Sequence, residues 1–228
     1  MSRGLTICDT IILEKVKLET DVSSEQISGV TGVVLAGGKS LRLGREKALE
    51  RVGKKRLIEN AVDSLRSISQ EVLVVTSQEQ FNNIASINLA ARVVVDIYPN
   101  KASFGGIYTG LSSSNTLYSI VVACDMPFLN SALLRYLFDL APSFDVVIPR
   151  FNGNIEALHA VYSRACLPAI RQLLDKNILQ IIQLLPLVRT RYVEDDEVNR
   201  YDPKHLSFFN INTRSDLLQA EEIIGHGS

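Results

Sequence analysis

Gly37 and Gly38 open a segment whose residue types are suited to binding a phosphate chain. From Gly32 to Leu49 the sequence is GVVLAGGKSLRLGREKAL, and four cations follow the glycine pair within nine residues, namely Lys39, Arg42, Arg45 and Lys47. Paired glycines let backbone N–H groups approach an anion closely, and clustered cations can neutralise a polyphosphate. The segment therefore indicates a nucleotide site. The structural alternative is a glycine turn followed by a solvated basic loop.

The letters GKS at 38–40 resemble the end of a Walker P-loop, but the spacing does not fit. A P-loop requires glycine, four residues, a second glycine, lysine, and then serine or threonine. The residue five positions before Gly38 is Val33, and counting from Gly32 places Gly38 where the lysine should stand. The intervening residues, VVLA, have the character of a buried strand, which leaves too little loop to surround a phosphate. No G-x-G-x-x-G motif follows this strand, which disfavours a Rossmann-type oxidoreductase.

Two carboxylates stand directly after apolar runs. Asp96 ends RVVVD, and Asp125 follows the run YSIVVAC within the motif CDMP. A carboxylate at the end of a central parallel strand is well placed to bind Mg²⁺ beside phosphates, although it can also serve as a structural cap. Together with the basic segment, the two residues predict magnesium-assisted chemistry on a nucleotide.

A third group of polar residues lies in FFNINT, residues 208–213. If this segment is a strand, Asn210 and Asn212 alternate and point to the same face. Asn212 or Thr213 could instead cap the last helix of the chain, because both residue types are preferred at helix N-termini. The sequence leaves both interpretations open.

The hydrophobic pattern predicts the framework that must position these residues. Strands are expected at 33–36, 71–77, 92–96, 118–125, 145–149, 158–163, 188–193 and 207–212. Helices are expected at 56–68, in the polar segment up to 85, at 130–140, over 165–185 with a break near Asn177, and at 215–224; a glycine-containing loop with a short helix is expected across 104–113. Apolar strands that alternate with helices predict an α/β fold with a parallel sheet covered on both faces, and ligands at the carboxyl ends of the strands.

Composition restricts the class of protein. The 228 residues are 46% hydrophobic and 21% charged, with a formal net charge of -1, so nucleic-acid binding by bulk electrostatics is not expected. Cys8, Cys124 and Cys166 form no CxxC motif, and neither a zinc knuckle nor a disulfide framework is indicated. Without an apolar run of about 18 residues or a signal-peptide pattern, no membrane partner is expected and the cytoplasm is the expected location. Residues 1–29 are expected to form an extension, and 30–228 a single domain.

Four motifs in this order resemble the molybdenum cofactor guanylyltransferases, a branch of the nucleotidyltransferase superfamily: LAGGKSLRLGREKAL, FGGIYTG, CDMPFL and FNINTRSDL. The resemblance runs from about Gly29 to Ile224. It implies a three-layer α/β/α, Rossmann-like nucleotidyltransferase fold with a mostly parallel central sheet. It also implies Mg²⁺-dependent transfer of GMP from GTP to the phosphate of molybdenum-bearing molybdopterin, with release of pyrophosphate, and transient contact with cofactor-insertion proteins or acceptor molybdoenzymes.

Carried over position by position, the resemblance implies a role for each motif residue. Lys47 and Arg42 would bind the triphosphate as catalytic residues, and Asp125 would hold the Mg²⁺. Asn210 and Asn212 would lie on the acceptor side, near the pterin. Further nucleotide contacts are implied for residues of the glycine loop and the strand ends: Leu35, Ala36, Gly37, Gly38, Asp96, Gly105 and Gly106.

Three positions depart from the family pattern. Ser103 and Phe104 stand where the family often has proline and leucine, Thr76-Ser77-Gln78 lacks an asparagine that some members carry, and DKNILQIIQLL lacks an arginine. The missing arginine leaves open the possibility that the acceptor substrate differs from that of the family.

The alternative functions are a cytidylyltransferase acting on molybdopterin, a sugar-phosphate nucleotidyltransferase, and a non-catalytic relative that binds GTP. The LAGG form of the first motif favours guanine, and pyrophosphate release separates an enzyme from a pure binder.

Overall fold

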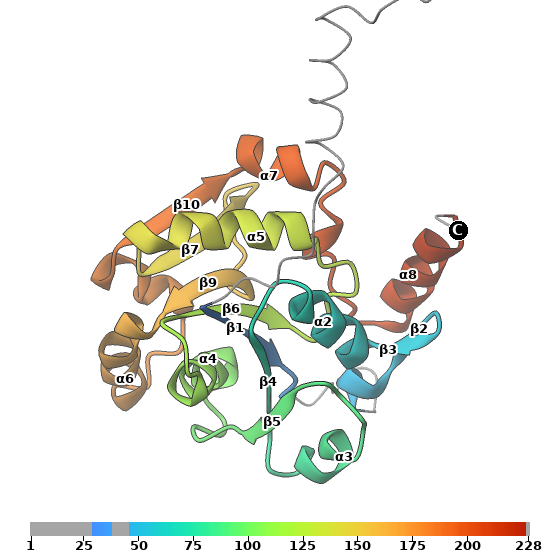
Figure 1. The fold of residues 1–228 in the computed structure, drawn as a ribbon, viewed down its shortest axis with the longest axis horizontal. Coiled ribbons are helices and arrows are strands. Elements are labelled where there is room, and N and C mark those ends of the chain that lie inside the picture. The colour runs from blue at the N-terminus through green and yellow to red at the C-terminus, as the bar shows by residue number, and fades with distance from the viewer. Residues whose placement is uncertain (1–28, 38–45, 227–228) are drawn as a thin grey trace, which may run out of the picture.

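The computed structural model describes residues 29–37 and 46–226 (Figure 1). Within this part of the chain, eight strands form one mixed sheet in the order β10-β7-β9-β6-β1-β4-β5, with the short β8 paired to β7. The strands have these bounds: β1 (Val30–Leu35), β4 (Glu71–Thr76), β5 (Arg92–Val95), β6 (Tyr118–Ala123), β7 (Val146–Phe151), β8 (Asn154–Ile155), β9 (His159–Ser163) and β10 (Thr190–Glu194). A separate hairpin joins β2 (Arg51–Val52) to β3 (Lys55–Arg56).

The sheet is mostly parallel because helices make the crossovers between its strands. β1 pairs in parallel with β4 and β6, β4 with β5, and β7 with β10, whereas β9 lies antiparallel between β6 and β7. The helices have these bounds: α2 (Leu57–Arg66), α3 (Phe81–Ala85), α4 (Ala102–Ser113), α5 (Ser131–Leu140), α6 (Leu167–Asp175), α7 (Asp195–Tyr201) and α8 (Arg214–His226). None of the helices in the described residues has the length and apolar character needed to cross a membrane.

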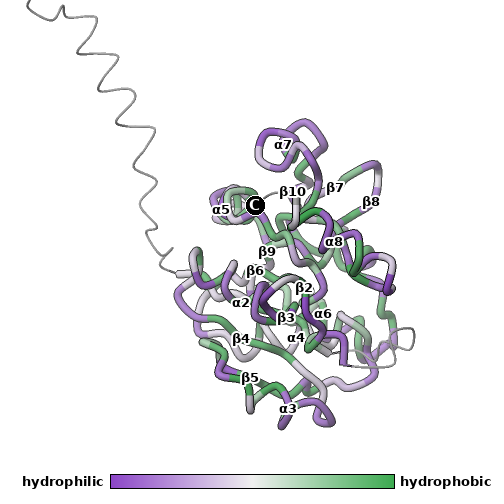
Figure 2. The backbone as a smooth tube through the Cα atoms, turned by 90° about the vertical axis from the view of Figure 1, so that its right-hand side faces the viewer, coloured by the Kyte–Doolittle hydropathy of each residue, from purple (hydrophilic) through white to green (hydrophobic). Residues whose placement is uncertain are grey.

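Two hydrophobic cores lie on opposite faces of the sheet. One packs the apolar sides of α2, α5 and α7 against it, and the other packs those of α4 and α6. All six residues of β1 are buried because the strand is central and covered on both faces. In Figure 2 the sheet strands are largely green, whereas the peripheral α7 is purple. The structure therefore confirms the predicted three-layer α/β/α architecture.

A third, smaller core connects the C-terminal helix to the hairpin. Val52, Leu57, Ile211 and Ala220 are its buried members, and α8 lies beside β2 and β3 in Figure 1. This core holds the segment before α8 against the loop that follows β6, because Phe128 and Phe209 also pack into it.

The expected strand at 207–212 is wrong. Residues Leu206–Phe208 form a 3-10 turn, and the residues up to 213 are irregular. Local hydrogen bonds replace strand pairing, since the Asp202 carboxylate accepts from the backbone N–H groups of Leu206 and Ser207. His205 has a φ of 53°, which turns the chain just before this segment.

Of the loop and short helix expected across 104–113, the helix is confirmed and the loop is wrong, because all these residues belong to a helix of 12 residues, α4. Its glycines serve close packing. A Cβ at Gly105 would lie 2.5 Å from the Tyr98 carbonyl oxygen, and one at Gly110 would lie 2.6 Å from Val33 Cγ1. The pattern also missed α7, whose sequence DDEVNRY has a single buried residue, Val198.

Other sequence predictions agree with the structure. The helix beginning near Asn130 is capped by that side chain, which accepts from the N–H groups of Ala132 and Leu133. The expected break near Asn177 falls after α6, and Asn177 has a φ of 56°. The predicted extension at 1–29 lies outside the described residues except for Gly29.

Candidate active site

The carboxyl ends of four parallel strands meet at one edge of the sheet. Backbone hydrogen bonds join them: Cys124 N donates to Leu35 O over 3.1 Å, Ala36 N to Val75 O over 2.8 Å, and Asp96 N to Thr76 O over 2.8 Å. The parallel register thereby brings the end of β1 beside the segments that carry Asp96 and Asp125. This edge is where parallel α/β sheets bind ligands.

Lys47, Asp125 and Asn212 form a charged cluster at this edge. The Lys47 ammonium makes a short ion pair with Asp125 Oδ2 and donates to Asn212 Oδ1 over 2.7 Å. The Lys47 and Asp125 side chains are only 15% and 17% exposed. We call these three residues the Lys47 cluster. It combines a cation, an anion and an amide from segments far apart in the sequence.

Asp125 has an unused ligand atom. Its Oδ1 is buried and has no hydrogen-bond partner among the described residues. Buried carboxylate oxygens normally have a hydrogen-bond partner, so this unpaired oxygen is suited to bind a cation. No group of three or more His, Cys, Asp or Glu side chains suited to a metal occurs in the described part of the chain. A single carboxylate suits Mg²⁺, which commonly takes its remaining ligands from substrate phosphates and water.

Asn212 is free to contact Lys47 because other groups cap α8. Thr213 Oγ1 accepts from Asp216 N over 3.2 Å, and Asp216 Oδ2 accepts from the N–H groups of Asn212 and Thr213 over 2.8 Å each. These two backbone hydrogen bonds are the main reason that the pKa of Asp216 lies below its usual value. Ile211 N donates to Asp125 O over 3.0 Å, which fixes the segment at the cluster. Thr213 is therefore the cap.

Asn210 does not join the Lys47 cluster. Its Nδ2 donates to Phe208 O over 2.9 Å. The expectation that Asn210 and Asn212 share one face depended on a strand at 207–212. Because that strand is absent, the alternation does not carry over to the structure.

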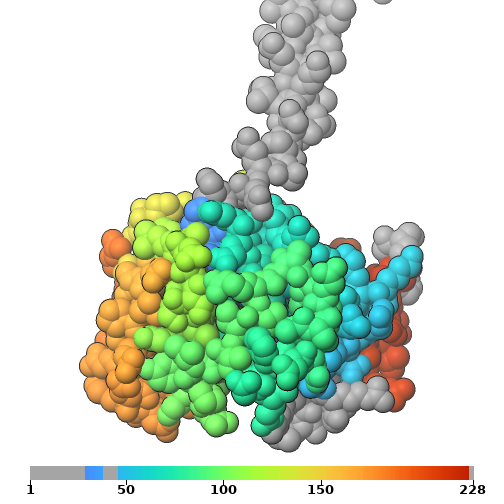
Figure 3. Space-filling model, turned by 60° about the horizontal axis from the view of Figure 1, so that its bottom comes forward, coloured from blue at the N-terminus to red at the C-terminus, as the bar shows by residue number. Residues whose placement is uncertain are grey.

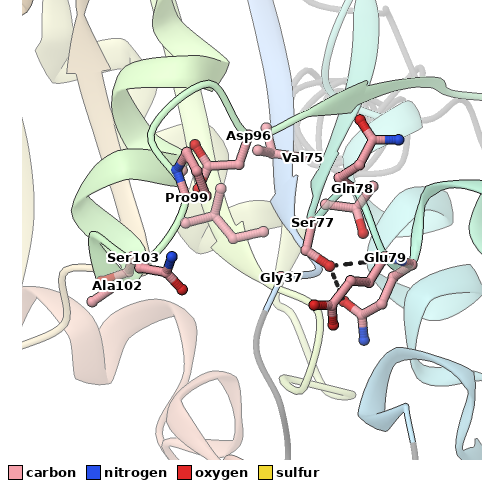
Figure 4. A pocket seen from close by; sticks show the side chains of 14 residues that line it. Gly37, Val75, Ser77, Gln78, Glu79, Asp96, Pro99, Ala102 and Ser103 are labelled. Carbon is pink, nitrogen blue, oxygen red and sulfur yellow. Dashed lines mark hydrogen bonds between the residues drawn. The ribbon is translucent and has the colours of Figure 1, made fainter.

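A cavity of about 440 Å³ opens at the ends of β1, β4 and β5 (Figure 4). In the space-filling view of Figure 3 the surface is hollowed between the green segment before α4 and the teal segment after β4. Its size lies within the range typical of small-molecule sites. Its lining combines apolar and polar residues: Leu35, Gly37, Val75, Thr76, Ser77, Gln78, Glu79, Gln80, Asp96, Pro99, Asn100, Ala102, Ser103 and Gly106.

Asp96 is held rigidly at this cavity. Its Oδ1 accepts from Thr109 Oγ1 over 2.7 Å and from Tyr98 N over 2.9 Å. Thr109 is fully buried on α4, and its hydroxyl also accepts from Ile97 N over 3.1 Å. With Oδ1 occupied twice, Oδ2 is the oxygen left to accept from a ligand hydroxyl.

The predicted glycines divide between the cavity and the framework. Gly37 is exposed at the cavity, and Gly106 lines it where an added Cβ would lie 3.2 Å from Leu35 Cδ2. Gly105 does not line it and instead lets α4 approach Tyr98. Gly38 and Arg42 lie outside the described residues.

The backbones of Leu35 and Ala36 take part in the sheet. The Leu35 carbonyl and the Ala36 N–H are already bonded within the sheet. Leu35 instead contributes its side chain to the cavity, where it forms part of an apolar wall with Val75.

Sequence reasoning missed three residues of the site. Thr109, Gln80 and Asp216 act through burial or hydrogen bonds that appear only in the folded chain. The one usable signal was Asp216, which stands three residues after Thr213 in the spacing of a capping box.

The chemistry of this edge is that of a nucleotide site. The cavity offers apolar surface for a base and a carboxylate for ribose hydroxyls, and the Lys47 cluster offers charge for phosphates and a metal ligand.

Comparison with known proteins supports the same assignment. The model of the MobA-like NTP transferase domain matches residues 32–190. A probable molybdenum cofactor guanylyltransferase of Pelotomaculum thermopropionicum is 36% identical over 190 residues, which cover 83% of this chain and 91% of the relative. The molybdenum cofactor guanylyltransferase of Desulfosudis oleivorans is 31% identical over 203 residues, covering 88% and 98%.

Solved structures show the same fold. Molybdopterin-guanine dinucleotide biosynthesis protein A from Archaeoglobus fulgidus superposes with a TM-score of 0.76 at 27% identity, covering 86% of this chain and 99% of that chain. A nucleotidyl transferase from Methanothermobacter shares the fold with a TM-score of 0.65 at 22% identity. The match covers 88% of this chain and 100% of that chain. By the domain match and by its similarity to these relatives, the chain belongs to the MobA-like NTP transferases and, within them, to the molybdenum cofactor guanylyltransferase family.

Proposed function

We propose that this protein transfers GMP from GTP to the phosphate of molybdenum-bearing molybdopterin, which gives the guanine dinucleotide cofactor and pyrophosphate. The observation that carries the proposal is that the Lys47 cluster lies at the same edge of the sheet as the cavity lined by Asp96. The relatives named as guanylyltransferases support the choice of nucleotide and acceptor.

The cavity would hold the nucleoside part of GTP. Leu35 and Val75 present apolar surface to the base, and Asp96 Oδ2 accepts from the ribose hydroxyls. The triphosphate then lies toward Gly37 and Lys47, since both follow β1 at the same edge of the sheet. Arg42 is proposed to act with Lys47, as the family motif implies.

The reaction is an in-line displacement at the α-phosphorus. A phosphate oxygen of the acceptor forms the new P–O bond, and the bond to the pyrophosphate oxygen breaks as its electron pair leaves with pyrophosphate. A phosphate monoester is already anionic near pH 7, so the protein needs no strong base, and positioning with charge neutralisation supplies the catalysis.

Lys47 stabilises the negative charge that moves onto pyrophosphate. Asp125 would hold Mg²⁺, which supplies positive charge to the phosphate oxygens when bound. Asn212 keeps the Lys47 ammonium in place through its Oδ1, and Asp216 fixes the backbone of Asn212.

Substrate and product suggest where the protein works. GTP is a cytoplasmic metabolite, so we place the protein in the cytoplasm. The product would pass to cofactor-insertion proteins or acceptor molybdoenzymes through transient contacts.

Nucleotide binding and pyrophosphate release test the proposal. With Mg²⁺ and molybdopterin, the wild-type protein should release pyrophosphate from GTP, and should bind GTP about tenfold more tightly than CTP or ATP in calorimetry. Lys47→Ala and Asp125→Asn should each lower the rate of release by about a hundredfold or more. Lys55→Ala is the matched control, because Lys55 is 57% exposed on β3 and pairs with Asp63.

The outcomes separate the alternatives. A preference for CTP would assign a cytidylyltransferase, and release of pyrophosphate only with a sugar phosphate would assign that acceptor class. Tight GTP binding without pyrophosphate release would assign a non-catalytic binder. Unchanged release after chelation of Mg²⁺ would contradict the role given to Asp125.

A further inference from the structure

Gln80 is a buried amide at the wall of the cavity. It immediately precedes α3, is 8% exposed, and lines the cavity with Ser77. Ser77 Oγ donates to Gln80 Oε1 over 3.4 Å and accepts from Gln80 N over the same distance. No described residue accepts a hydrogen bond from Gln80 Nε2. Gln80 Nε2 therefore stays at the accessible surface of the cavity wall, where it can donate to a ligand acceptor.

A second polar group at the same wall is also unpaired. The Thr76 hydroxyl is buried, lines the cavity and has no hydrogen-bond partner among the described residues. Gln78 differs from both, because its side chain is exposed. The end of β4 and the turn after it thus offer buried polar groups to whatever occupies the cavity.

The opposite wall sets the direction of a bound nucleoside. Asp96 directly follows β5 and Ser103 belongs to α4, whereas Ser77 and Gln80 come from the turn after β4 (Figure 4). If the ribose contacts Asp96, the base extends across Leu35 and Val75 toward the turn. Its hydrogen-bonding edge then faces Gln80.

We propose that Gln80 selects the nucleobase by donating a hydrogen bond from Nε2 to the 6-keto oxygen of guanine. The inference rests on the proposed function, since it requires a purine nucleotide in the cavity. Ser77 orients the amide by binding Oε1, which leaves the donor side toward the ligand. Adenine carries an amino group at position 6, so two donors would face each other and remain unpaired in a buried site.

Substrates that differ only at the base edge test this directly. The wild-type protein should use GTP and ITP with similar kcat/KM, because both have the 6-keto oxygen, and should use ATP much less well. Gln80→Met should lower kcat/KM for GTP and ITP by about tenfold, since it removes one hydrogen bond, and should not lower kcat/KM for ATP, since it also removes the opposed donor. Gln80→Glu, which replaces the donor with an acceptor, should lower the GTP-to-ATP ratio by about a hundredfold.

Two control variants separate base recognition from charge and general damage. Gln172→Glu changes an exposed amide on α6 and should leave the GTP-to-ATP ratio and the activity unchanged. Gln78→Glu adds the same charge at the rim of the cavity and should affect all three nucleotides by the same factor, so the ratio stays constant. If Gln80 variants fail to fold, Ser77→Ala provides the test, because loss of the orienting hydroxyl should lower the ratio severalfold.

Failure of this inference differs from failure of the proposed function. Suppose that the wild-type protein prefers GTP to ATP and that Gln80→Met has the same GTP-to-ATP ratio. This result would overturn the role of Gln80 alone. If Gln80→Met does not fold, an unchanged ratio in Ser77→Ala would have the same meaning. A wild-type protein that uses ITP far less well than GTP would also overturn it, because recognition would then depend on the 2-amino group. A wild-type protein that does not favour GTP would overturn both.

Discussion

Replacing Thr109 by valine should weaken GTP binding although Thr109 touches no nucleotide. Valine matches threonine in shape but lacks the hydroxyl that donates to Asp96 Oδ1 over 2.7 Å. A hydrogen bond to a charged group contributes about 1.5–3 kcal/mol, so its loss corresponds to roughly a ten- to hundredfold change in an equilibrium constant. We therefore expect KM for GTP to rise at least about tenfold, with kcat nearly unchanged, because Thr109 positions a binding residue and not the reacting phosphates.

The assay is pyrophosphate release at varied GTP, with Thr109→Ser as the matched control. Serine keeps the hydroxyl and should retain nearly the wild-type KM. A second readout uses 2′-deoxy-GTP. If Asp96 binds the ribose hydroxyls, the wild-type protein should discriminate against 2′-deoxy-GTP more strongly than Thr109→Val does. The reasoning would be refuted if urea titration shows that Thr109→Val is folded and this variant has the wild-type KM for GTP and the wild-type discrimination against 2′-deoxy-GTP.

Two further predictions concern the stability of the fold. Gly110→Ala should destabilise the protein by about 1–2 kcal/mol in urea unfolding, since overpacking against Val33 outweighs the gain in helix propensity. Gly225→Ala in α8 is the control: its added Cβ has no neighbour within 4 Å, so the change should be neutral or slightly stabilising. An equal effect of both alanines would contradict the packing argument. Burial lowers the pKa of His159 to about 4, with Asp202 opposing the shift. Folding therefore favours the neutral imidazole, and the contribution of His159 to the free energy of unfolding is fully present above the unfolded pKa near 6.5. This contribution should be lost, by about 3 kcal/mol, as the pH falls from 6.5 to about 4. In urea titrations at several pH values, His159→Phe should flatten this dependence, and an unchanged slope in the variant would exclude His159 as its source.

Much of the framework was predictable because buried strands appear in the sequence as runs of apolar residues. β1, β4 and β6 are covered on both faces, so each contains a run of at least four apolar residues that ends at a glycine or a polar residue. Asp96 and Asp125 were recognisable for the same reason, since each stands where such a run stops. The parallel topology then required their strand ends to share one edge of the sheet.

Local pattern failed where hydrogen bonds between side chain and backbone decided the conformation. FFNIN alternates like a strand, but Asp202 binds the N–H groups just before it and the chain turns. The glycines of α4 suggest a loop, yet Gly105 and Gly110 are needed for the close approach of the helix to Tyr98 and Val33. In the first case the competing contact comes from Asp202, a near neighbour outside the alternating pattern, and in the second case Gly110 meets Val33 from a distant part of the chain.

The sequence by itself determined the fold class, the strand ends that carry the chemistry and, through its motifs, the family. Only the tertiary structure decided which side chains act together. Lys47 and Asn212 are 165 positions apart and still share a hydrogen bond, and Asp125 joins them from 78 positions after Lys47. Their meeting depends on the small core under α8, and the place of Gln80 at the cavity wall depends on the turn after β4. Spacing along a chain records periodicity and local turns, whereas convergence and burial are properties of the packed molecule.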